Sequence, residues 1–273
     1  MAKDAQPELL LGKQVPVTPH YAPELLYPIP RSQARLELGI EGSLPFHGVD
    51  LWHLYELSWL DASGKPVVAQ GRLSIPVSSR NLVESKSLKL YLNSLNSHRF
   101  DSREQALATM QTDITATVGA PVKLDLFDTD DQAFAGVQLQ GQCIDQEPVD
   151  GVASKPAPEL LTTGRHTVTE TLYSHLLRSL CPVTGQPDWA SVWLRYTGPA
   201  MDRGGLLAFL LGFRNHQEFH EQCVERIYCA LRDACQPDSL TVQALYTRRG
   251  GLDICPLRST GPDAEPLGRI NRQ

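Results

Sequence analysis

Strand-like and helix-like segments occur in separate runs within each half of this chain, and this separation constrains the fold more than any other feature. In the first half, strand-like residues 51–60 and 67–75 precede a helical pattern at 84–95. A second helix is expected after Ser102-Arg-Glu-Gln105, which has the form of a capping box. Because strands and helices do not alternate strictly, the pattern predicts an α+β fold with antiparallel sheets.

The second half shows the same separation. A helix is expected at 167–179, opened by Thr167 and Glu170 as a capping box. It should end at Cys181-Pro182, because proline cannot continue a helix. The other elements expected in the chain are strands at 122–126, at 134–143 as its partner, at 190–196 and at 240–247, and helices near 203–213 and 218–235.

The two halves resemble each other at a constant offset of 137 residues. With this offset Trp52 matches Trp189, and Glu84 matches Glu221. The excess of matches over chance is modest, but it includes a tryptophan and favours a duplicated module. We therefore predict an N-terminal extension at 1–45, a first module at 46–143, a linker at 144–165 and a second module at 166–273.

Composition excludes several classes of function. Of 273 residues, 41% are hydrophobic and 21% are charged, which is the mixture of an ordinary globular protein. The net charge of −6 argues against nucleic acid or a membrane surface as the main partner. No apolar run approaches the ~18 residues of a spanning helix, and the N-terminal MAKDAQPELLLGKQ has no signal-peptide pattern. We therefore expect a soluble, cytoplasmic protein whose cysteines are thiols.

Cys181 and Asp188 are the strongest candidates for chemistry. The cysteine lies on an irregular segment, Cys181-Pro-Val-Thr-Gly-Gln-Pro-Asp188-Trp, which we expect to be accessible. A thiolate nucleophile with a carboxyl group as proton donor would use both residues. The alternative is a small residue that fills a loop and a solvated acid. At the end of a helix, moreover, the dipole would raise the pKa of this thiol, so its activation must come from another group.

Two basic segments suit a phosphate-bearing ligand. Ser85 and Lys86 lie near the first turn of the expected helix at 84–95, and Glu84 beside them can accept N–H groups of a heterocycle. The turn Arg248-Arg249-Gly250-Gly251 offers two guanidinium groups for phosphates. The alternative for the segment at 84–95 is a capped amphipathic helix without a ligand, and the alternative for the segment at 248–251 is a basic turn without a ligand.

One helical face carries potential metal ligands. His216, His220 and Cys223 share that face. The chain has no CxxC pair and no obvious fourth ligand elsewhere, so we expect no metal here. A helix start that presents His220 and Glu221 to an organic ligand is the favoured interpretation.

Taken together, these motifs closely resemble those of one enzyme family. The segments concerned are Glu84-Ser-Lys-Ser-Leu-Lys-Leu-Tyr91, Cys181 to Trp189, Phe219-His220-Glu221 and Arg248-Arg249-Gly-Gly251. The family is that of the NADPH-dependent 7-cyano-7-deazaguanine reductases, nitrile reductases of queuosine biosynthesis. The resemblance is to the longer, two-module type and runs from about Phe46 to Ile254.

The resemblance implies a tandem tunnelling fold (T-fold), in which antiparallel sheets are backed by helices, and assembly as a homodimer. It implies Cys181 as nucleophile and Asp188 as proton donor. The implied substrate-binding residues are Val83, Glu84, Ser85, His220 and Glu221, and the implied NADPH-binding residues are Ser85, Lys86, Arg249 and Gly250. No metal is implied.

The implied chemistry suits these residue types. A thiolate attacks the weakly electrophilic nitrile carbon and gives a thioimide, whose nitrogen needs a proton. Reduction to the amine then takes two hydrides, hence two NADPH. The chain has no glycine-rich dinucleotide fingerprint, which would count against NADPH only in a Rossmann fold. Two alternatives remain open at this point, a zinc-dependent purine or pterin cyclohydrolase-like enzyme and a non-enzymatic heterocycle-binding protein.

Overall fold

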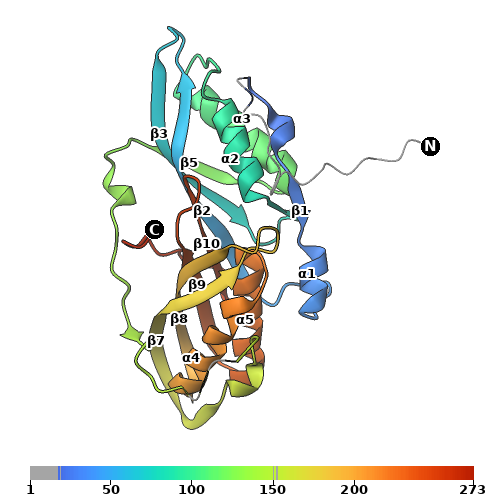
Figure 1. Cartoon of the computed structure of the whole chain (residues 1–273), viewed down its shortest axis with the longest axis vertical. Coiled ribbons are helices and arrows are strands. Elements are labelled where there is room, and N and C mark those ends of the chain that lie inside the picture. Colours follow the sequence, from blue (N-terminus) through green and yellow to red (C-terminus); the bar gives the residue numbers. More distant parts are fainter. Residues whose placement is uncertain (1–17, 19, 150, 152) are drawn as a thin grey trace, which may run out of the picture. The chain divides into compact units, whose positions relative to one another are not determined.

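A computed structural model of the chain describes residue 18, residues 20–149, residue 151 and residues 153–273 (Figure 1). The predicted N-terminal extension and linker therefore lie partly outside the described residues. The chain forms two compact units, each assembled from separate stretches of sequence. The first holds the residues up to Gln33, Trp52–Asp131 and Arg249–Leu252, and the second holds Ala34–Leu51, Gln132–Arg248 and Asp253–Gln273.

The first unit is built on an antiparallel sheet with strand order β5-β3-β2. Strands β2 (His47–Leu60), most of which lies in this unit, and β3 (Pro66–Pro76) are joined by a tight turn. Asp61 closes it, because its Oδ1 accepts the backbone N–H groups of Ser63 and Lys65 at 2.9 and 3.0 Å. Strand β5 (Lys123–Phe127) lies at the other edge of β3, and β1 (Pro28–Pro30) pairs with β4 (Asn81–Val83).

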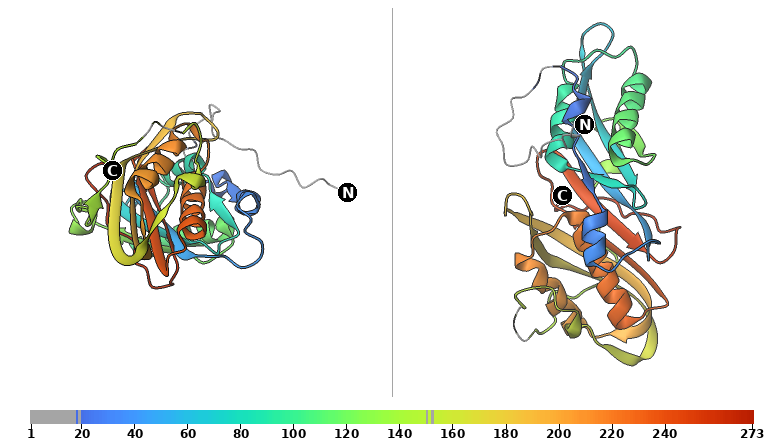
Figure 2. Two further views of the ribbon diagram at one scale, coloured as in Figure 1. Left: turned by 90° about the horizontal axis from the view of Figure 1, so that it is seen from below. Right: turned by 90° about the vertical axis from the view of Figure 1, so that its right-hand side faces the viewer.

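Two helices complete the first unit, α2 (Ser85–Ser94) and α3 (Arg103–Val118), which lie next to its strands (Figure 2). Each starts where the sequence predicts, because a side chain caps it. Ser102 accepts the N–H of Gln105 at 3.1 Å at the start of α3. The buried residues of the helices follow one face, from Leu88 and Tyr91 in α2 to Met110 and Ile114 in α3.

The second unit contains an antiparallel sheet with strand order β10-β9-β8-β7, to which the two-residue β6 adds in parallel. Its strands are β6 (Gln142–Cys143), β7 (Thr163–Leu180), β8 (Pro187–Met201), β9 (Ser239–Tyr246) and β10 (Leu252–Ser259). Helices α4 (Arg203–Leu211) and α5 (His220–Cys235) lie along one face of the sheet (Figure 1). A small apolar cluster of Leu51, Leu245, Cys255 and Ile270 receives Leu139 and Leu267.

A buried ion network anchors α5 in the second unit. Glu225 of α5 bonds to Arg35 at 2.8 Å and to Arg258 of β10 at 2.9 Å. Arg258 also pairs with Asp50 at 2.8 Å and is fully buried. Arg35 belongs to the short helix α1 (Ser32–Glu37). Because a buried charge is costly unless it is paired, this network fixes where α5 lies against the sheet.

The α+β class with antiparallel sheets is confirmed, but three local predictions are wrong. The helix expected at 167–179 is the strand β7, whose first part is rich in β-branched residues. Segment 134–143 does not pair with β5, since β6 at its end pairs with β7. The 137-residue offset aligns Leu73 of strand β3 with Leu210 of helix α4, so one ungapped offset cannot relate the two halves. In the described part of the chain, no helix has the length and apolar character of a membrane span.

Candidate active site

Cys181 lies at the turn that joins β7 to β8 in the second unit. Its N–H donates to the carbonyl of Gln186 at 2.9 Å, and its own carbonyl accepts the N–H of Gly185 at the same distance. Gly185 has a φ of 67°, which few other residues adopt without strain. The turn residue Gln186 is exposed, but Cys181 itself is only 3% exposed. The expectation of an accessible cysteine is therefore wrong for the thiol and right for the segment around it.

The expected effect of a helix dipole on the Cys181 thiol depended on a helix before it, and β7 stands in that place. Leu180, the residue before Cys181, pairs in the sheet with Pro187. Cys181 consequently does not follow a helix, and the dipole effect expected from a helix end does not apply.

Asp188 and His220 form a buried pair beside this turn. Asp188 is cross-strand partner of Ser179 and is 4% exposed. Its Oδ2 lies 3.1 Å from Nε2 of His220, the first residue of α5. A carboxyl group and an imidazole at this distance can hold one proton between them. The carboxyl group of this pair lies on β8, the strand that follows Cys181, and the imidazole lies at the start of α5.

The imidazole of His220 is held flat against the ring of Tyr246. The ring centroids are 3.8 Å apart and the planes are inclined by 11°. Tyr246, on β9, is fully buried, and burial raises its pKa well above the ordinary value. Nδ1 of His220 is buried and has no hydrogen-bond partner in the described part of the chain. It can therefore receive a ligand.

The start of α5 is fixed by a second ion cluster. Glu218 binds Arg226 at 2.6 Å and His216 at 3.0 Å. Burial opposes the charge of Glu218, but the bonds from His216 and Arg226 outweigh it and lower the pKa of this carboxyl group. Glu221, in the first turn of α5, is only 4% exposed. This cluster keeps the first turn of the helix, which carries His220 and Glu221, in one orientation.

The residues expected in the first unit gather around the start of α2. Val83 ends β4, and the Glu84 carboxylate accepts the N–H groups of Lys86 and Ser87 at 2.9 and 2.7 Å. Burial is the largest influence on Glu84 and raises its pKa, although both backbone bonds oppose the shift. Glu84 is thus the cap of α2, and Ser85 and Lys86 stand half-buried in the first turn.

Arg249 and Gly250 also belong to the first unit and form the turn between β9 and β10. The N–H of Arg249 donates to the carbonyl of Leu252 at 2.9 Å. Gly250 has a φ of 60°, and a Cβ there would lie 3.0 Å from Cδ of Lys89. A larger residue would press on Lys89, which pairs with Glu56 at 3.2 Å. A glycine therefore lets this turn approach α2.

Comparisons with known proteins bear on the whole chain. Residues 18–126 match the family described as nitrile reductase, 7-cyano-7-deazaguanine-reductase N-term, and residues 187–265 match that of QueF-like proteins. An NADPH-dependent 7-cyano-7-deazaguanine reductase of Dechloromonas aromatica is 53% identical over 94% of this chain and 92% of its own length. That of Chromohalobacter salexigens is 49% identical over 96% of both chains, and that of Bordetella avium 50% identical over 94% of both.

The chain belongs to the NADPH-dependent 7-cyano-7-deazaguanine reductase family. The predicted family resemblance is thereby confirmed. A solved structure of the archaeosine synthase QueF-Like is 13% identical, with a TM-score of 0.31 over 37% of this chain and 99% of that chain. So weak a likeness carries no argument about this member of the reductase family.

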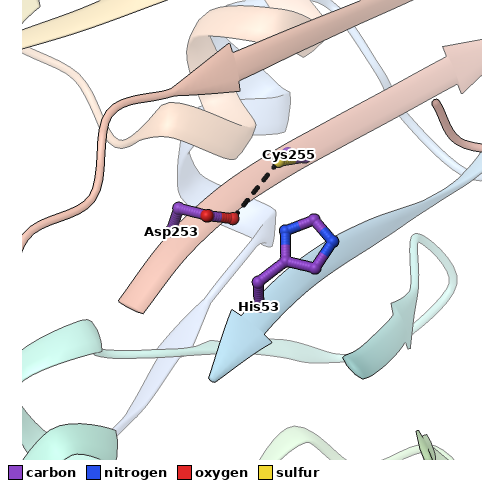
Figure 3. Close-up of side chains that lie close together, drawn as sticks. All are labelled: His53, Asp253 and Cys255. Atoms are coloured by element: carbon purple, nitrogen blue, oxygen red, sulfur yellow. Dashed lines mark hydrogen bonds between the residues drawn. The ribbon is translucent and has the colours of Figure 1, made fainter. Parts of the chain in front are cut away.

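The cysteines other than Cys181 are poor nucleophiles in this reductase family member. Burial raises the pKa of each of them, to about 11 for Cys229 and Cys235. On β10, Cys255 Sγ lies 3.5 Å from Oδ1 of Asp253 (Figure 3) and accepts a bond from Gln273 at 3.0 Å. A thiol beside a carboxylate in the core remains protonated.

The residues of the metal alternative bond to partners within the protein. His216 bonds to Glu218, His220 bonds to Asp188, and Cys223 Sγ lies 4.0 Å from the carbonyl of Glu218. The predicted helical face of His216, His220 and Cys223 is only partly correct, because α5 begins at His220 and His216 precedes the helix in extended conformation. Its polar groups serve the acid–imidazole pair and the start of the helix.

Sequence reasoning missed Tyr246 and Glu218. Alternation along β9 would have placed Tyr246 on the same buried face as Ala244. No sequence pattern predicts that the ring of Tyr246 stacks on His220. Glu218 lies two residues before His220, and its pairing with Arg226 eight positions later crosses two turns of α5. Both are contacts that only folding creates.

Proposed function

We propose that this protein reduces the nitrile of 7-cyano-7-deazaguanine to 7-aminomethyl-7-deazaguanine with NADPH, in queuosine biosynthesis for tRNA modification. The observation that carries the proposal is 53% identity, over 94% of the chain, to a curated enzyme named for this activity. The turn that holds Cys181 next to the Asp188–His220 pair supports it, because thiol addition to a nitrile needs a nucleophile and a proton donor in one place.

In the proposed mechanism the thiol of Cys181 gives its proton to the Asp188–His220 pair, and the resulting thiolate sulfur forms a bond to the nitrile carbon. One π bond of the C≡N group breaks, and its electron pair becomes a bond from nitrogen to a proton delivered by Asp188. The 3.1 Å contact with His220 allows that pair to hold the proton before transfer. The product of this step is a thioimide, and no electrons have yet been taken from a cofactor. Two NADPH would each supply one hydride, four electrons in total, and two further protons complete the amine while the C–S bond breaks and releases Cys181 as the thiol.

We assign recognition of the base to Val83, Glu84, Ser85, His220 and Glu221. The buried Nδ1 of His220 supports this, since it lacks a partner within the described part of the chain. Each Glu84 oxygen accepts one backbone bond and retains a second lone pair for an N–H of the base.

We assign NADPH binding to Ser85, Lys86, Arg249 and Gly250. Lys86 and Arg249 suit a phosphate-bearing cofactor because their side chains are cationic. The first N–H groups of α2 bind the Glu84 carboxylate, so phosphate would be held by the cationic side chains of Lys86 and Arg249. The lack of a Cβ at Gly250 lets the turn that carries Arg249 lie close to α2, the helix that carries Lys86.

We further propose a homodimer in the cytoplasm, whose chain has an extension at 1–45 and modules at 46–143 and 166–273 that are joined by a linker at 144–165. The assembly is measured directly by light scattering of the purified chain.

The decisive experiment is intact-protein mass spectrometry after incubation with the nitrile and no NADPH. A single adduct on Cys181 is expected, with loss of that adduct and of turnover in Cys181→Ala. Cys143→Ala is the matched control, because Cys143 is the exposed cysteine and lies on β6. Near-normal turnover in Cys181→Ala would refute the mechanism. Zinc bound stoichiometrically, without NADPH consumption, would favour a cyclohydrolase, and binding without any turnover would favour a heterocycle-binding protein.

A further inference from the structure

Three arginine side chains surround one tryptophan in the second unit. The guanidinium carbons of Arg178, Arg214 and Arg272 lie 5.7, 5.5 and 5.5 Å from the centroid of a ring of Trp189. They come from β7, from the 3₁₀ turn after α4, and from the C-terminal segment. Three distant parts of the sequence thus bring positive charge to one indole.

This cluster lies on the face of the sheet opposite the proposed catalytic acid. Arg178 and Trp189 are cross-strand partners, and the neighbouring rung pairs Ser179 with Asp188. Because side chains alternate between the two faces of a sheet, the two rungs point in opposite directions. The arginine cluster is therefore a separate site behind the hairpin end that carries Cys181.

No carboxylate among the described residues balances the positive charge of the cluster. Among the described residues, Arg178 donates to the carbonyl of Arg214 at 2.7 Å and to the Asn215 side chain at 3.5 Å. Arg272 donates to the carbonyl of His175 at 2.6 Å. These neutral acceptors orient two guanidinium groups without cancelling their charge. In a chain of net charge −6, three cations held around one ring form a local field that attracts an anion.

A cavity adjoins the cluster and shares Arg272 with it. Its volume is about 430 Å³, and Tyr173, His175 and Asn271 are among its lining residues. The rings of Tyr173 and His175 meet edge to face, with centroids 5.3 Å apart. His175 is oriented by a 2.6 Å bond between Nδ1 and Ser191. Aromatic surface with a few fixed polar groups is the usual lining of a small-molecule site.

We propose that the Trp189 arginine cluster and this cavity form a binding site for a phosphate ester of mononucleotide size. The phosphate binds Arg178, Arg214 and Arg272, and the organic part enters the cavity beside Tyr173. Arginine is suited to this, because its planar fork donates two parallel bonds to phosphate. The site shares no residue with those assigned to the nitrile, to the base or to NADPH.

Isothermal titration calorimetry at constant ionic strength tests the site, with pyrophosphate, adenosine 5′-monophosphate and adenosine as probes. The two phosphate compounds should bind saturably, and adenosine at least ~10-fold more weakly, because it lacks the charge-assisted bonds. Arg214→Gln should weaken pyrophosphate by ~10-fold or more. This side chain makes no hydrogen bond within the described residues, so its loss leaves the fold intact. Arg165→Gln, an exposed arginine at the start of β7, is the matched control and should change nothing.

A second variant tests the link between cluster and cavity. Arg272→Gln should weaken both phosphate compounds, because Arg272 belongs to the cluster and to the cavity lining. Equal affinities in Arg214→Gln and Arg165→Gln, or no saturable heat with either phosphate compound, would overturn the proposal. Competition with NADPH identifies the source of the phosphate. If NADPH displaces the mononucleotide, the phosphate that occupies this site is a phosphate of NADPH. If both bind independently, the phosphate belongs to a separate metabolite.

Discussion

The stack of Tyr246 on His220 makes a specific prediction about substrate affinity. The two rings are nearly parallel, with centroids 3.8 Å apart, and His220 Nε2 is aimed at Asp188. If His220 contacts the base, its orientation depends on the ring beneath it. Tyr246→Phe keeps that ring and removes only the hydroxyl group. Tyr246→Leu removes the flat surface while it leaves an apolar side chain in the core.

The expected size of the effect follows from the stack and from the volume lost. An aromatic pair contributes about 0.5–1.5 kcal/mol beyond the area it buries. In binding terms this is a loss of about 2- to 12-fold in affinity for the base. Tyr246→Leu also opens a cavity in a fully buried position, which should lower the free energy of unfolding by about 1–3 kcal/mol. Tyr246→Phe should change base affinity by less than about 2-fold, because the stack remains.

The assay is the KM for the nitrile at saturating NADPH, measured together with the thermal midpoint. Tyr246→Leu should raise KM more than Tyr246→Phe does, and should also shift the pH dependence of kcat, because a loosened imidazole no longer holds its proton against Asp188. A purely structural role predicts lower stability with an unchanged KM and pH profile. If Tyr246→Leu is destabilised but matches Tyr246→Phe in both kinetic readouts, the positioning role of Tyr246 is refuted.

Three further predictions concern individual side chains. Asp188→Asn keeps the size of the side chain but cannot deliver a proton, so turnover should fall by ~10²–10⁴-fold with little change in base affinity; a variant within a few-fold of wild type would make Asp188 structural. Lys86→Ala should raise the KM for NADPH and leave the adduct on Cys181 intact, because the adduct forms before any hydride arrives; loss of the adduct with unchanged NADPH dependence would place Lys86 in the base pocket. The folded-state pKa of Glu218 is lowered, so its stabilisation is present above the unfolded pKa and is lost as pH falls through the folded pKa. Glu218→Gln should therefore lower the free energy of unfolding by about 1–3 kcal/mol at neutral pH. Its melting temperature should also fall less steeply with decreasing pH than that of wild type, and an equally steep fall would contradict the prediction.

The start of α3 was predictable because a capping side chain marks it, whereas the same pattern at Thr167 and Glu170 lies in the strand β7. The Ser102 cap predicted the start of α3, and the hydroxyl group of Ser102 does accept the N–H of Gln105. Gln105 itself reaches the N–H of Asp101, one residue before the cap, at 2.7 Å. These contacts lie within five positions of sequence, so local chemistry is sufficient to find them.

The helix expected at 167–179 rested on Thr167 and Glu170 as a capping box, but in β7 Glu170 accepts bonds from Tyr196 and Arg203. The buried residues of this strand also do not alternate cleanly. Leu172 and Ser174 are buried, and then Leu177 and Ser179, so the pattern slips by one residue between them. The register shift between Ser174 and Leu177 explains the slip, because a bulge inserts an extra residue into one strand. A three-residue step between buried positions imitates helical spacing, and the pairing partner that would correct it lies in β8.

The strand β10 was not predicted, because its pattern of apolar and polar residues is that of neither an exposed nor a buried strand. All eight of its residues are buried, including Asp253 and Arg258, so it shows neither alternation nor a uniform apolar run. Arg258 is accommodated only because Asp50 and Glu225 neutralise it at 2.8 and 2.9 Å. A sequence pattern cannot show that a charged residue is a core residue when its partners are 33 or more positions away.

Asp188 and Trp189 show that two consecutive residues of a strand can belong to different sites. Asp188 and Trp189 are consecutive, and the sequence treats them as one feature of a single site. In β8 they lie on opposite faces, Asp188 with His220 and Trp189 with the arginine side chains. A strand serves two sites at once because neighbouring side chains diverge by its geometry. Substitution of Trp189 should therefore reach the nitrile chemistry only through the backbone of the hairpin, whereas substitution of Asp188 acts on the proton itself.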